Sequence, residues 1–368
     1  MRKVHTTMAA LALLGAAGAA QAQSSVQIYG LIDTAVEHLT NVNAAGDSLT
    51  RMPNLSGGMF PSRIGFRGQE DLGDGLRAVF TLENGLQPDS GGMNQGNRLF
   101  GRQAWVGLAG SFGTVTMGRT YSMLFQSFFD VDVIGPSQFS IGSLDLYLPN
   151  ARHDNSISYK GVFSGLTVGA TYSFGRDTSS AGGPAATNCA GENAADAQAC
   201  RNWSTMLRYD AAGKQWGVLG AYDTYHGGGG AAAAFSPTSS ARTDTRWHIA
   251  GYGKIGDATI AGGFLHRNNE GNAVTPTSTL TYLGMTYLFT PQFSLDAQVA
   301  RLDFKNSPND TNMAVVRGTY YLSKRTAIYG LVGRVSNGGT AAVALSAGAT
   351  VAPGGTQNGI MTGIQHTF

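Results

Sequence analysis

The sequence has little charge of either sign. Only 13% of its 368 residues are charged, with 25 Lys and Arg against 23 Asp and Glu. If an N-terminal leader carrying Arg2 and Lys3 is removed, 23 basic residues face 23 acidic ones, so the mature chain is formally neutral. A nucleic-acid-binding protein needs a basic surplus, and we therefore expect no nucleic-acid partner.

Long apolar runs are also missing beyond residue 22. A membrane-spanning helix needs about 20 consecutive, mostly apolar residues, so a helical membrane protein is excluded. A closed β-barrel is the other way to cross a bilayer, because it satisfies its backbone hydrogen bonds internally. A soluble two-domain β protein is the alternative that a chain of this length allows.

Catalytic motifs are scarce. The sequence contains no GxSxG, HExxH or CxxC motif and no Walker lysine. Residues Gly251–Gly256 (GYGKIG) match GxGxxG, but they run from a strand into a short turn, and nucleotide binding would require a following helix. We therefore expect no enzyme and no cofactor, although a barrel lipase would not need adjacent Ser and His residues.

The first 22 residues have the pattern of a secretory leader. Arg2 and Lys3 are followed by small and apolar residues from Met8 to Ala20, and Ala20-Gln21-Ala22 fits a small-x-small cleavage site. We predict a cleaved signal peptide at residues 1–22 and one barrel domain at residues 23–368.

What the sequence does contain is glycine, aromatic residues and a period of two. There are 52 Gly, 17 Phe and 14 Tyr, which suit short strands, tight turns and aromatic girdles. About sixteen segments have strand character, the first at Val26–His38 and the last at Gly359–Phe368. In the segment that starts at Leu166, apolar residues alternate with Thr167, Gly169, Thr171 and Ser173, as lipid-facing and lumen-facing positions would.

The connections between these segments alternate in length. Short links such as Gly110–Gly113 and Phe163–Gly165 alternate with long ones such as Ser122–Asp154 and Gly175–Arg201. Short turns at one rim and long loops at the other are typical of an outer-membrane barrel, whereas a soluble sandwich gives no reason for this alternation.

Several motifs resemble one family. They are VQIYGLIDTAVEH at Val26, SRIGFRGQEDLGDGLRAVFTLENG at Ser62, GRQAWVGLAGSFGTVTMGRTY at Gly101, NSISYKG at Asn155 and the closing GIQHTF. Together they resemble the general porins of β-proteobacteria, a Gram-negative trimeric family. The resemblance implies a sixteen-stranded antiparallel transmembrane barrel in the outer membrane, a homotrimer, and passive diffusion of ions and small hydrophilic solutes.

The same resemblance implies that the third long loop, Ser122–Asp154, folds into the lumen and forms a constriction opposite a basic cluster. Phe125, Phe128, Phe129 and Phe139 are available to pack this loop against the inner wall. The constriction candidates are Arg63, Arg67, Arg77, Arg119, Lys160, Glu83, Asp130, Asp132 and Asp145. Opposed charges of this kind would create a transverse field in a narrow pore.

Two arginines do not fit simple alternation. Arg102 and Arg119 would point outward, where an arginine facing lipid costs roughly 2 to 4 kcal/mol. Either they lie near a rim or a bulge changes the parity, so Arg119 is included and Arg102 is left out. At the end of the chain, Gln365 and Thr367 stand where relatives often carry basic residues, which weakens a prediction of strong anion selectivity.

The chain has only two cysteines, Cys189 and Cys200, in the fourth long loop. In a secreted protein they predict a disulfide that encloses ten residues. A metal site is the alternative, with Glu192 and Asp196 as the neighbouring ligand candidates. We expect no metal.

The last strand carries the spacing of a barrel assembly signal at Gly363, His366 and Phe368. We expect it to be recognised by the barrel-assembly machinery and to pair with the strand that begins at Val26, removing the last sheet edge. Outer-membrane lipid and lipopolysaccharide are the other expected partners. The alternatives to a general porin are a substrate-preferring channel and, from another class, a barrel enzyme or adhesin with a plugged lumen.

Overall fold

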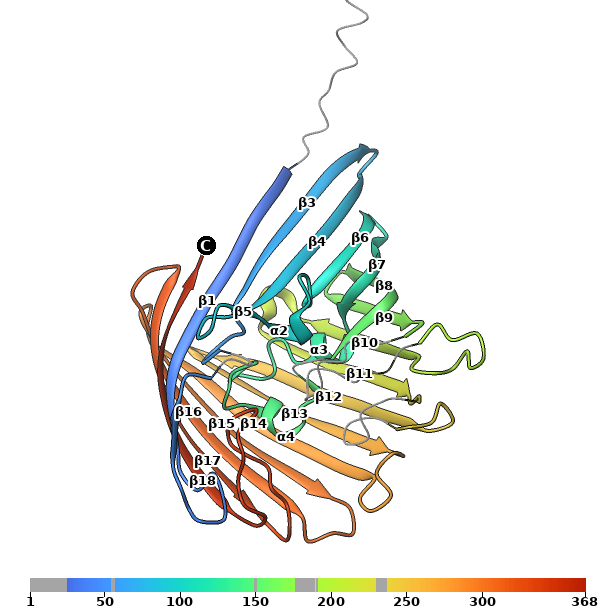
Figure 1. Ribbon diagram of the computed structural model, residues 1–368. Helices are drawn as coiled ribbons and strands as arrows, with labels where there is room; N and C mark the ends of the chain where they lie inside the picture. Colours follow the sequence, from blue (N-terminus) through green and yellow to red (C-terminus); the bar gives the residue numbers. More distant parts are fainter. Residues whose placement is uncertain (1–24, 54–56, 149–150, 176–188, 190, 230–236) are drawn as a thin grey trace, which may run out of the picture.

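The computed structural model is a closed antiparallel barrel. It describes residues 25–53, 57–148, 151–175, 189, 191–229 and 237–368. The predicted signal peptide, residues 1–22, lies outside the described residues. Sixteen long strands follow one another around the barrel, and β1 pairs with both β3 and β18, so the sheet has no free edge (Figure 1). This closure confirms the predicted fold class.

The long strands are β1 (Ser25–Leu39), β3 (Arg63–Gly73), β4 (Leu76–Gln87), β6 (Gln103–Gly110), β7 (Gly113–Tyr121), β8 (Arg152–Phe163), β9 (Leu166–Ser173), β10 (Asn202–Asp210), β11 (Trp216–His226), β12 (Thr243–Ile255), β13 (Ala258–Asn269), β14 (Thr277–Thr290), β15 (Phe293–Phe304), β16 (Asp310–Tyr321), β17 (Thr326–Asn337) and β18 (Thr356–Thr367). The connections hold β2 (Leu49–Arg51), β5 (Gly92–Met93), α2 (Asn94–Asn97), α3 (Met123–Ser127), α4 (Ile141–Leu144) and the 3-10 turn η2 (Ala212–Lys214). No described helix has both the length and the apolar composition needed to cross a bilayer.

The alternation of short turns and long loops is confirmed. Turn residues with positive φ, such as Gly165 at +89° and Gly256 at +58°, close the short links, which is the conformation glycine adopts without strain. Gly256 belongs to the GYGKIG segment and lies in the turn between β12 and β13. No helix follows it, so the nucleotide-binding interpretation fails there.

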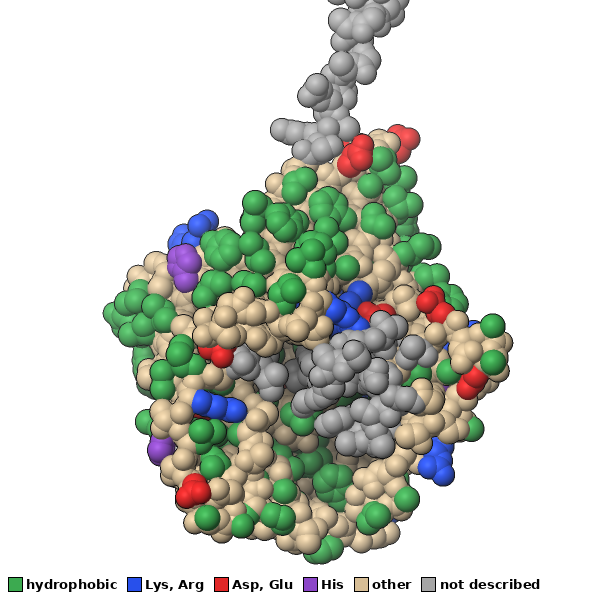
Figure 2. Space-filling view, in the orientation of Figure 1, with side chains coloured by type: hydrophobic (Ala, Val, Ile, Leu, Met, Phe, Trp, Pro, Cys, Tyr) green, Lys and Arg blue, Asp and Glu red, His purple; other side chains and the backbone are tan. Residues whose placement is uncertain are grey.

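The two faces of the wall also follow the predicted parity. In β9, Thr167, Thr171 and Ser173 are buried toward the lumen, while Leu166 and Tyr172 are exposed on the outside. Figure 2 shows hydrophobic side chains gathered over β1, β3 and β4, in the upper part of the view, with few charged side chains among them. Such an apolar outer surface is what a lipid-facing barrel wall presents.

Aromatic pairs mark both ends of the strands. Tyr209 and Trp216 flank a short turn with their rings 5.6 Å apart. Trp203 and Tyr222 lie toward the long-loop end, with rings 4.9 Å apart. Aromatic residues at the two interfaces are the girdles expected of an outer-membrane barrel.

The hydrophobic core lies inside the barrel rather than between layers. Side chains of the third long connection, here called loop 3 and described for residues 122–148 and 151, pack against inward-facing residues of the wall. Phe139 and Ile141 of loop 3 belong to one buried cluster with Leu280 of β14 and Leu331 of β17. Loop 3 therefore folds into the lumen, as the family resemblance implied.

Candidate functional site

Loop 3 is ordered by two short helices and by hydrogen bonds to the wall. The Ser122 side chain caps α3 by accepting from the Phe125 amide. On the opposite wall, Arg317 of β16 donates to the carbonyls of Ile134 (2.7 Å) and Val133 (3.1 Å). These contacts tie the middle of loop 3 to β16 and keep its backbone polar groups paired.

The phenylalanines of loop 3 do not all behave alike. Phe139 is fully buried, Phe128 stacks on His248 with ring centroids 4.2 Å apart, and Phe125 stacks on Tyr121 at 4.5 Å. Phe129 is 46% exposed and meets Phe125 only edge-on. Three of the four therefore pack as expected, and Phe129 faces the open lumen.

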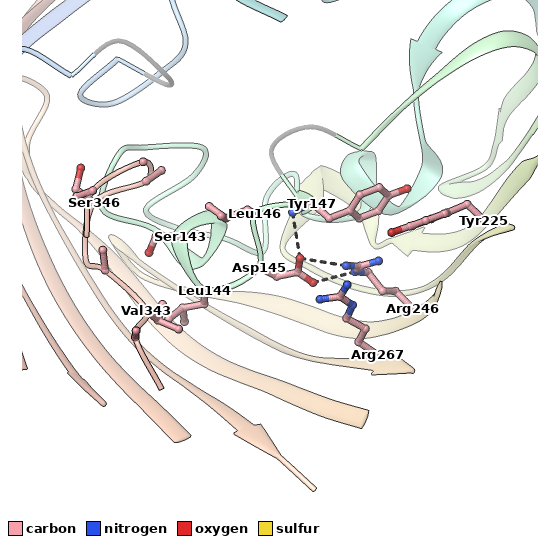
Figure 3. A pocket seen from close by; sticks show the side chains of 15 residues that line it. Ser143, Leu144, Asp145, Leu146, Tyr147, Tyr225, Arg246, Arg267, Val343 and Ser346 are labelled. Atoms are coloured by element: carbon pink, nitrogen blue, oxygen red, sulfur yellow. Dashed lines mark hydrogen bonds and ion pairs between the residues drawn. The ribbon is translucent and has the colours of Figure 1, made fainter. Parts of the chain in front are cut away.

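Asp145 attaches loop 3 to β12 (Figure 3). Arg246, which is 1% exposed, donates from Nε to Oδ2 of Asp145 at 2.8 Å and from Nη2 to Oδ1 at 3.1 Å. Burial alone would raise the pKa of Asp145, but the Arg246 and Arg267 guanidinium groups lower it to about 2. Asp145 is thus ionised and neutralised, and with Tyr147 and Tyr225 it borders a cavity of about 250 Å³.

The other two loop-3 acids also turn toward the wall. Asp130 pairs with Arg208 of β10 at 2.6 Å and with Lys214 at 3.4 Å. Burial raises the pKa of Asp132 to about 7, despite the nearby Gln298 amide and Arg317 charge. Asp132 therefore stays protonated to a higher pH than an ordinary aspartate. None of the three acids has a partner on β3 or β4 among the ion pairs of the described residues.

An arginine cluster occupies the wall of β3, β4 and the strands that follow. Its centre is Glu83, which accepts from Arg102 Nε at 2.7 Å and from Tyr29 at 2.9 Å. Arg63 Nε lies 3.7 Å from the same carboxylate, and Arg63 remains more accessible than Arg102, with 27% against 5% of the side chain exposed.

Arg152 completes this cluster. Its guanidinium lies 4.8 Å from the centre of the Tyr121 ring and donates to the carbonyl of Arg102 at 3.2 Å. The Glu83 carboxylate thus has two guanidinium partners, Arg63 and Arg102, and Arg152 lies behind them against the Arg102 carbonyl and the Tyr121 ring. Sequence reasoning missed Arg152, and it left out Arg102 because alternation was extended one residue before β6, which begins only at Gln103.

Arg119 follows the bulge alternative. The pairing of β7 with β8 shifts between Gly118 and Thr120, and Gly118 has φ of +129°. The extra residue places the Arg119 side chain in a buried position. There it donates to the carbonyl of Gly101 at 2.8 Å and pairs with Asp154. Arg119 therefore ties Gly101 and Asp154 to β7, and its contacts are not shared with Arg63.

The remaining basic candidates lie nearer the short-turn end of the lumen. Arg67 donates to Gln27 at 2.9 Å, Arg77 donates to Gln69 at 3.3 Å, and Lys160 donates to Gln126 of loop 3 at 2.8 Å. All three side chains are exposed. The structure thus divides the predicted set into an arginine cluster nearer the long-loop end and a group of accessible cations nearer the short-turn end.

Most inward-facing acids of the wall, in contrast, are hidden. Six of these acids each have at most 4% of their surface exposed: Asp33, Glu37, Glu83, Asp223, Asp244 and Asp296. Near the short turns, Asp71 accepts from the Gly73 amide at 2.9 Å, and Asp210 is paired with Arg208 at 2.7 Å. These buried acids are therefore withdrawn from the lumen water, whereas Arg67, Arg77 and Lys160 are exposed. The signal was present in the sequence, since acids at inward positions of apolar strands need buried partners.

Cys189 and Cys200 form a disulfide, with Cα atoms 5.4 Å apart, and this confirms the prediction. Both are buried, and the Cys200 amide donates to the carbonyl of Gly227 in the next long connection at 3.0 Å. No group of three His, Cys, Asp or Glu side chains within the described ranges is placed to hold a metal ion.

Replacing both cysteines with Ser should lower barrel stability by about 2 to 3 kcal/mol, because the unfolded chain regains the freedom that a short closed loop had removed. The single-channel conductance should stay unchanged, since the disulfide lies away from the arginine cluster. Thermal unfolding with and without a reducing agent measures this. The double variant serves as the control, because the reducing agent should not affect it, and an identical unfolding temperature in oxidised and reduced protein would contradict the prediction.

The three residues of the predicted assembly signal have distinct surroundings. A side chain at Gly363 would meet the Tyr329 hydroxyl, since a Cβ there would lie 2.2 Å away. His366 contacts Thr326 at 2.9 Å, and Phe368 pairs through its backbone with Gly30. Their recognition by the assembly machinery stays a prediction.

Comparisons with known proteins agree with this architecture. A family model described as Gram-negative porin matches residues 7–340. Outer membrane porin protein 32 of Delftia acidovorans is 30% identical over 98% of this chain and 99% of that protein. An outer membrane porin protein of Bordetella pertussis is 39% identical over 46% of this chain, and the match spans about half (48%) of that protein.

Solved structures give the same result. The anion-selective porin from Comamonas acidovorans superposes with a TM-score of 0.76 and 25% identity, over 94% of this chain and all of that one. OmpT of Vibrio cholerae, in its trimer form, superposes with a TM-score of 0.63 over 94% of this chain and 99% of that one. At 16% identity, the second likeness concerns the fold alone.

Proposed function

We propose that the lumen of this chain, which belongs to the Gram-negative porin family, favours small anions over cations. As an outer-membrane porin it forms a channel for passive diffusion. The observation that carries the proposed preference is the difference in exposure between the two signs of charge. Arg67, Arg77 and Lys160 are accessible in the lumen, whereas the inward-facing acids are mostly buried or paired.

Physical reasoning supports the sign of this preference. In a narrow wet pore, fixed charges that solvent can reach raise the local concentration of the opposite ion. The sequence suggested an acidic loop 3 opposite basic strands, but Asp130 and Asp145 are neutralised by Arg208 and Arg246. The similar Comamonas protein is described as anion-selective, which agrees with the proposal. Gln365 and Thr367 add no positive charge to the last strand, so we expect a moderate preference.

Replacing Arg63, Arg67 and Arg77 together with Gln should shift the reversal potential under a KCl gradient toward potassium. The expected fall in the permeability ratio of chloride to potassium is roughly threefold, because three lumen charges are lost. Planar-bilayer recordings measure it. Arg301→Gln is the matched control, since Arg301 lies in an exposed pair with Asp303 on β15. An unchanged reversal potential in the triple variant would rule out these arginines as the source of selectivity.

The same recordings separate the alternatives. A substrate-preferring channel would show saturable block by its solute, and a barrel enzyme or adhesin with a plugged lumen would give no stable conductance steps. We further propose that the protein is a homotrimer in contact with outer-membrane lipid and lipopolysaccharide. That residues 1–22 are a cleaved signal peptide, and that the assembly machinery recognises the last strand, also remain proposals.

A further inference from the structure

A recess of about 590 Å³ lies on the short-turn side of loop 3, between this loop and the inner wall of the barrel. Arg77 and Lys160 lie at its two sides, and the strand register explains why. Arg77 pairs with Ala109, Ala109 with Thr114, and Thr114 with Lys160, so the four residues form one row across β4, β6, β7 and β8. Three strand spacings separate the two cations by about 14 Å at their Cα atoms.

The small residues between them leave the floor of the recess open. Ala109 and Thr114 are short, so the longer Arg77 and Lys160 side chains stand above them on either side. Thr116 and Ser158 add hydroxyl groups to the lining. The recess therefore offers two cations and several hydroxyl donors around a space large enough for a small organic solute.

Acidic groups near the recess are already engaged. No Asp or Glu is among the residues that line it. Asp71 lies across from Arg77 in the register; it is exposed, and its Oδ1 accepts from the Gly73 amide. Asp130, next to the lining residue Phe129, is paired with Arg208 and Lys214. Arg77 and Lys160 are exposed and no carboxylate lines the recess with them, so an anion in the recess meets two positive charges.

Aromatic side chains supply the other half of the recess. Trp105 lines it with its Nε1 held by Gln103 Oε1 at 3.0 Å, which restrains the indole. Phe129 also lines it and is 46% exposed, although the other loop-3 phenylalanines pack against neighbours. A phenylalanine exposed in a watery lumen has a face to offer to an apolar ligand.

We propose that the Arg77–Lys160 recess binds aromatic carboxylates, solutes that carry an anionic carboxylate on a planar apolar ring. The ammonium of Lys160 and the guanidinium of Arg77 would take the carboxylate, and Trp105 and Phe129 would contact the ring. This inference rests on the proposed anion preference and adds a solute class to it. Tyr121 borders both this recess and the arginine cluster around Glu83, but that cluster has no exposed ring comparable to Phe129 among the described residues.

The test measures chloride current through the wild-type channel in planar bilayers while benzoate is added to either side. Benzoate should reduce the current saturably. Acetate, which has the charge without the ring, and benzyl alcohol, which has the ring without the charge, should reduce it far less at the same concentration. Lys160→Gln should raise the half-blocking benzoate concentration about fivefold, and Phe129→Leu should raise it about threefold.

Lys254→Gln is the matched control, because Lys254 is an exposed lysine near the short-turn end of β12 that does not line the recess. It should leave the benzoate block unchanged. Equal block by benzoate and acetate would overturn recognition of the ring, and equal block in wild type and Lys160→Gln would overturn the site. Chloride preference in KCl without any benzoate block overturns this inference alone, whereas loss of chloride preference overturns the proposed function.

Discussion

Replacing Asp145 with Ala should cost about 3 kcal/mol of stability or more and loosen loop 3 in the lumen. Arg246 is 1% exposed and would keep Asp244, which lies 3.2 Å from its Nη1, as its one acidic partner among the described residues, together with the face of the Tyr147 ring. Asp244 already pairs with Arg267 at 2.6 Å, so two buried or half-buried guanidinium groups would share one carboxylate. An uncompensated charge that remains buried is the reason for the large effect.

The measurement combines thermal unfolding with single-channel recording. The unfolding temperature should fall, and the open-channel current should become noisier because loop 3 lies inside the lumen and would be less firmly held. Asp303→Ala is the matched control, since the Asp303–Arg301 pair is about half exposed and such pairs contribute about 1 kcal/mol or less. If Asp145→Ala and Asp303→Ala unfold at the same temperature, Asp145 does not anchor loop 3 as described.

The same contact should have a defined response to acid. The pKa of Asp145 is about 2 in the folded protein, because the Arg246 and Arg267 charges outweigh the effect of burial. The pKa of an Asp in an unfolded chain is about 4. The contribution of Asp145 is therefore complete above about pH 4 and is lost only as the pH falls from there toward 2. The stability difference between wild type and Asp145→Asn should be constant from pH 5 to 8, roughly, and shrink below pH 4.

Deleting Phe368 should reduce the yield of assembled protein several-fold before it alters conductance. The Phe368 backbone exchanges two hydrogen bonds with Gly30, each 3.1 Å long, and these are the last bonds that close β18 against β1. The Phe368 ring also covers Gly30, where an added Cβ would lie 2.2 Å from it. Without these contacts the end of the barrel seam is open, and an open sheet edge in a bilayer leaves backbone groups unpaired.

Unheated detergent gels measure this effect, because an assembled trimer should migrate as a large species that collapses on boiling. Phe368→Tyr should assemble normally, since it keeps both the backbone bonds and an aromatic ring. Ile364→Val, at another outward position of β18, is the control for a mild change in the same strand. Normal trimer yield after the deletion would show that the last residue has little part in assembly.

Much of the fold could be predicted from the sequence, because strand periodicity is a local property. Each of the sixteen predicted segments corresponds to a strand, although the ends moved by a few residues. The last strand, for example, runs from Thr356 to Thr367 instead of Gly359 to Phe368. The loops at one end and turns at the other followed from glycine and polar residues alone.

The site was predicted less completely, and the reasons are physical. Arg119 depended on a bulge at Gly118, which period-two alternation does not show. Arg102 lies just before β6, so alternation had no meaning there. The loop-3 acids were identified correctly as charged residues of the third loop, but their partners could not be foreseen. Asp145 and Arg246, for instance, are 101 positions apart in the chain.

The inward third loop was implied by the family resemblance, and the sequence by itself predicted the closed barrel and the disulfide in the fourth long loop. Those features depend on the alternation of neighbouring residues, on turn chemistry and on motifs that lie close together. Only the tertiary structure decided which charges face the lumen, because that depends on how the curved wall and loop 3 bring distant residues together. Asp33, Asp244 and Asp296 are buried while Arg77 and Lys160 stay accessible, and this difference is the basis of the proposed anion preference.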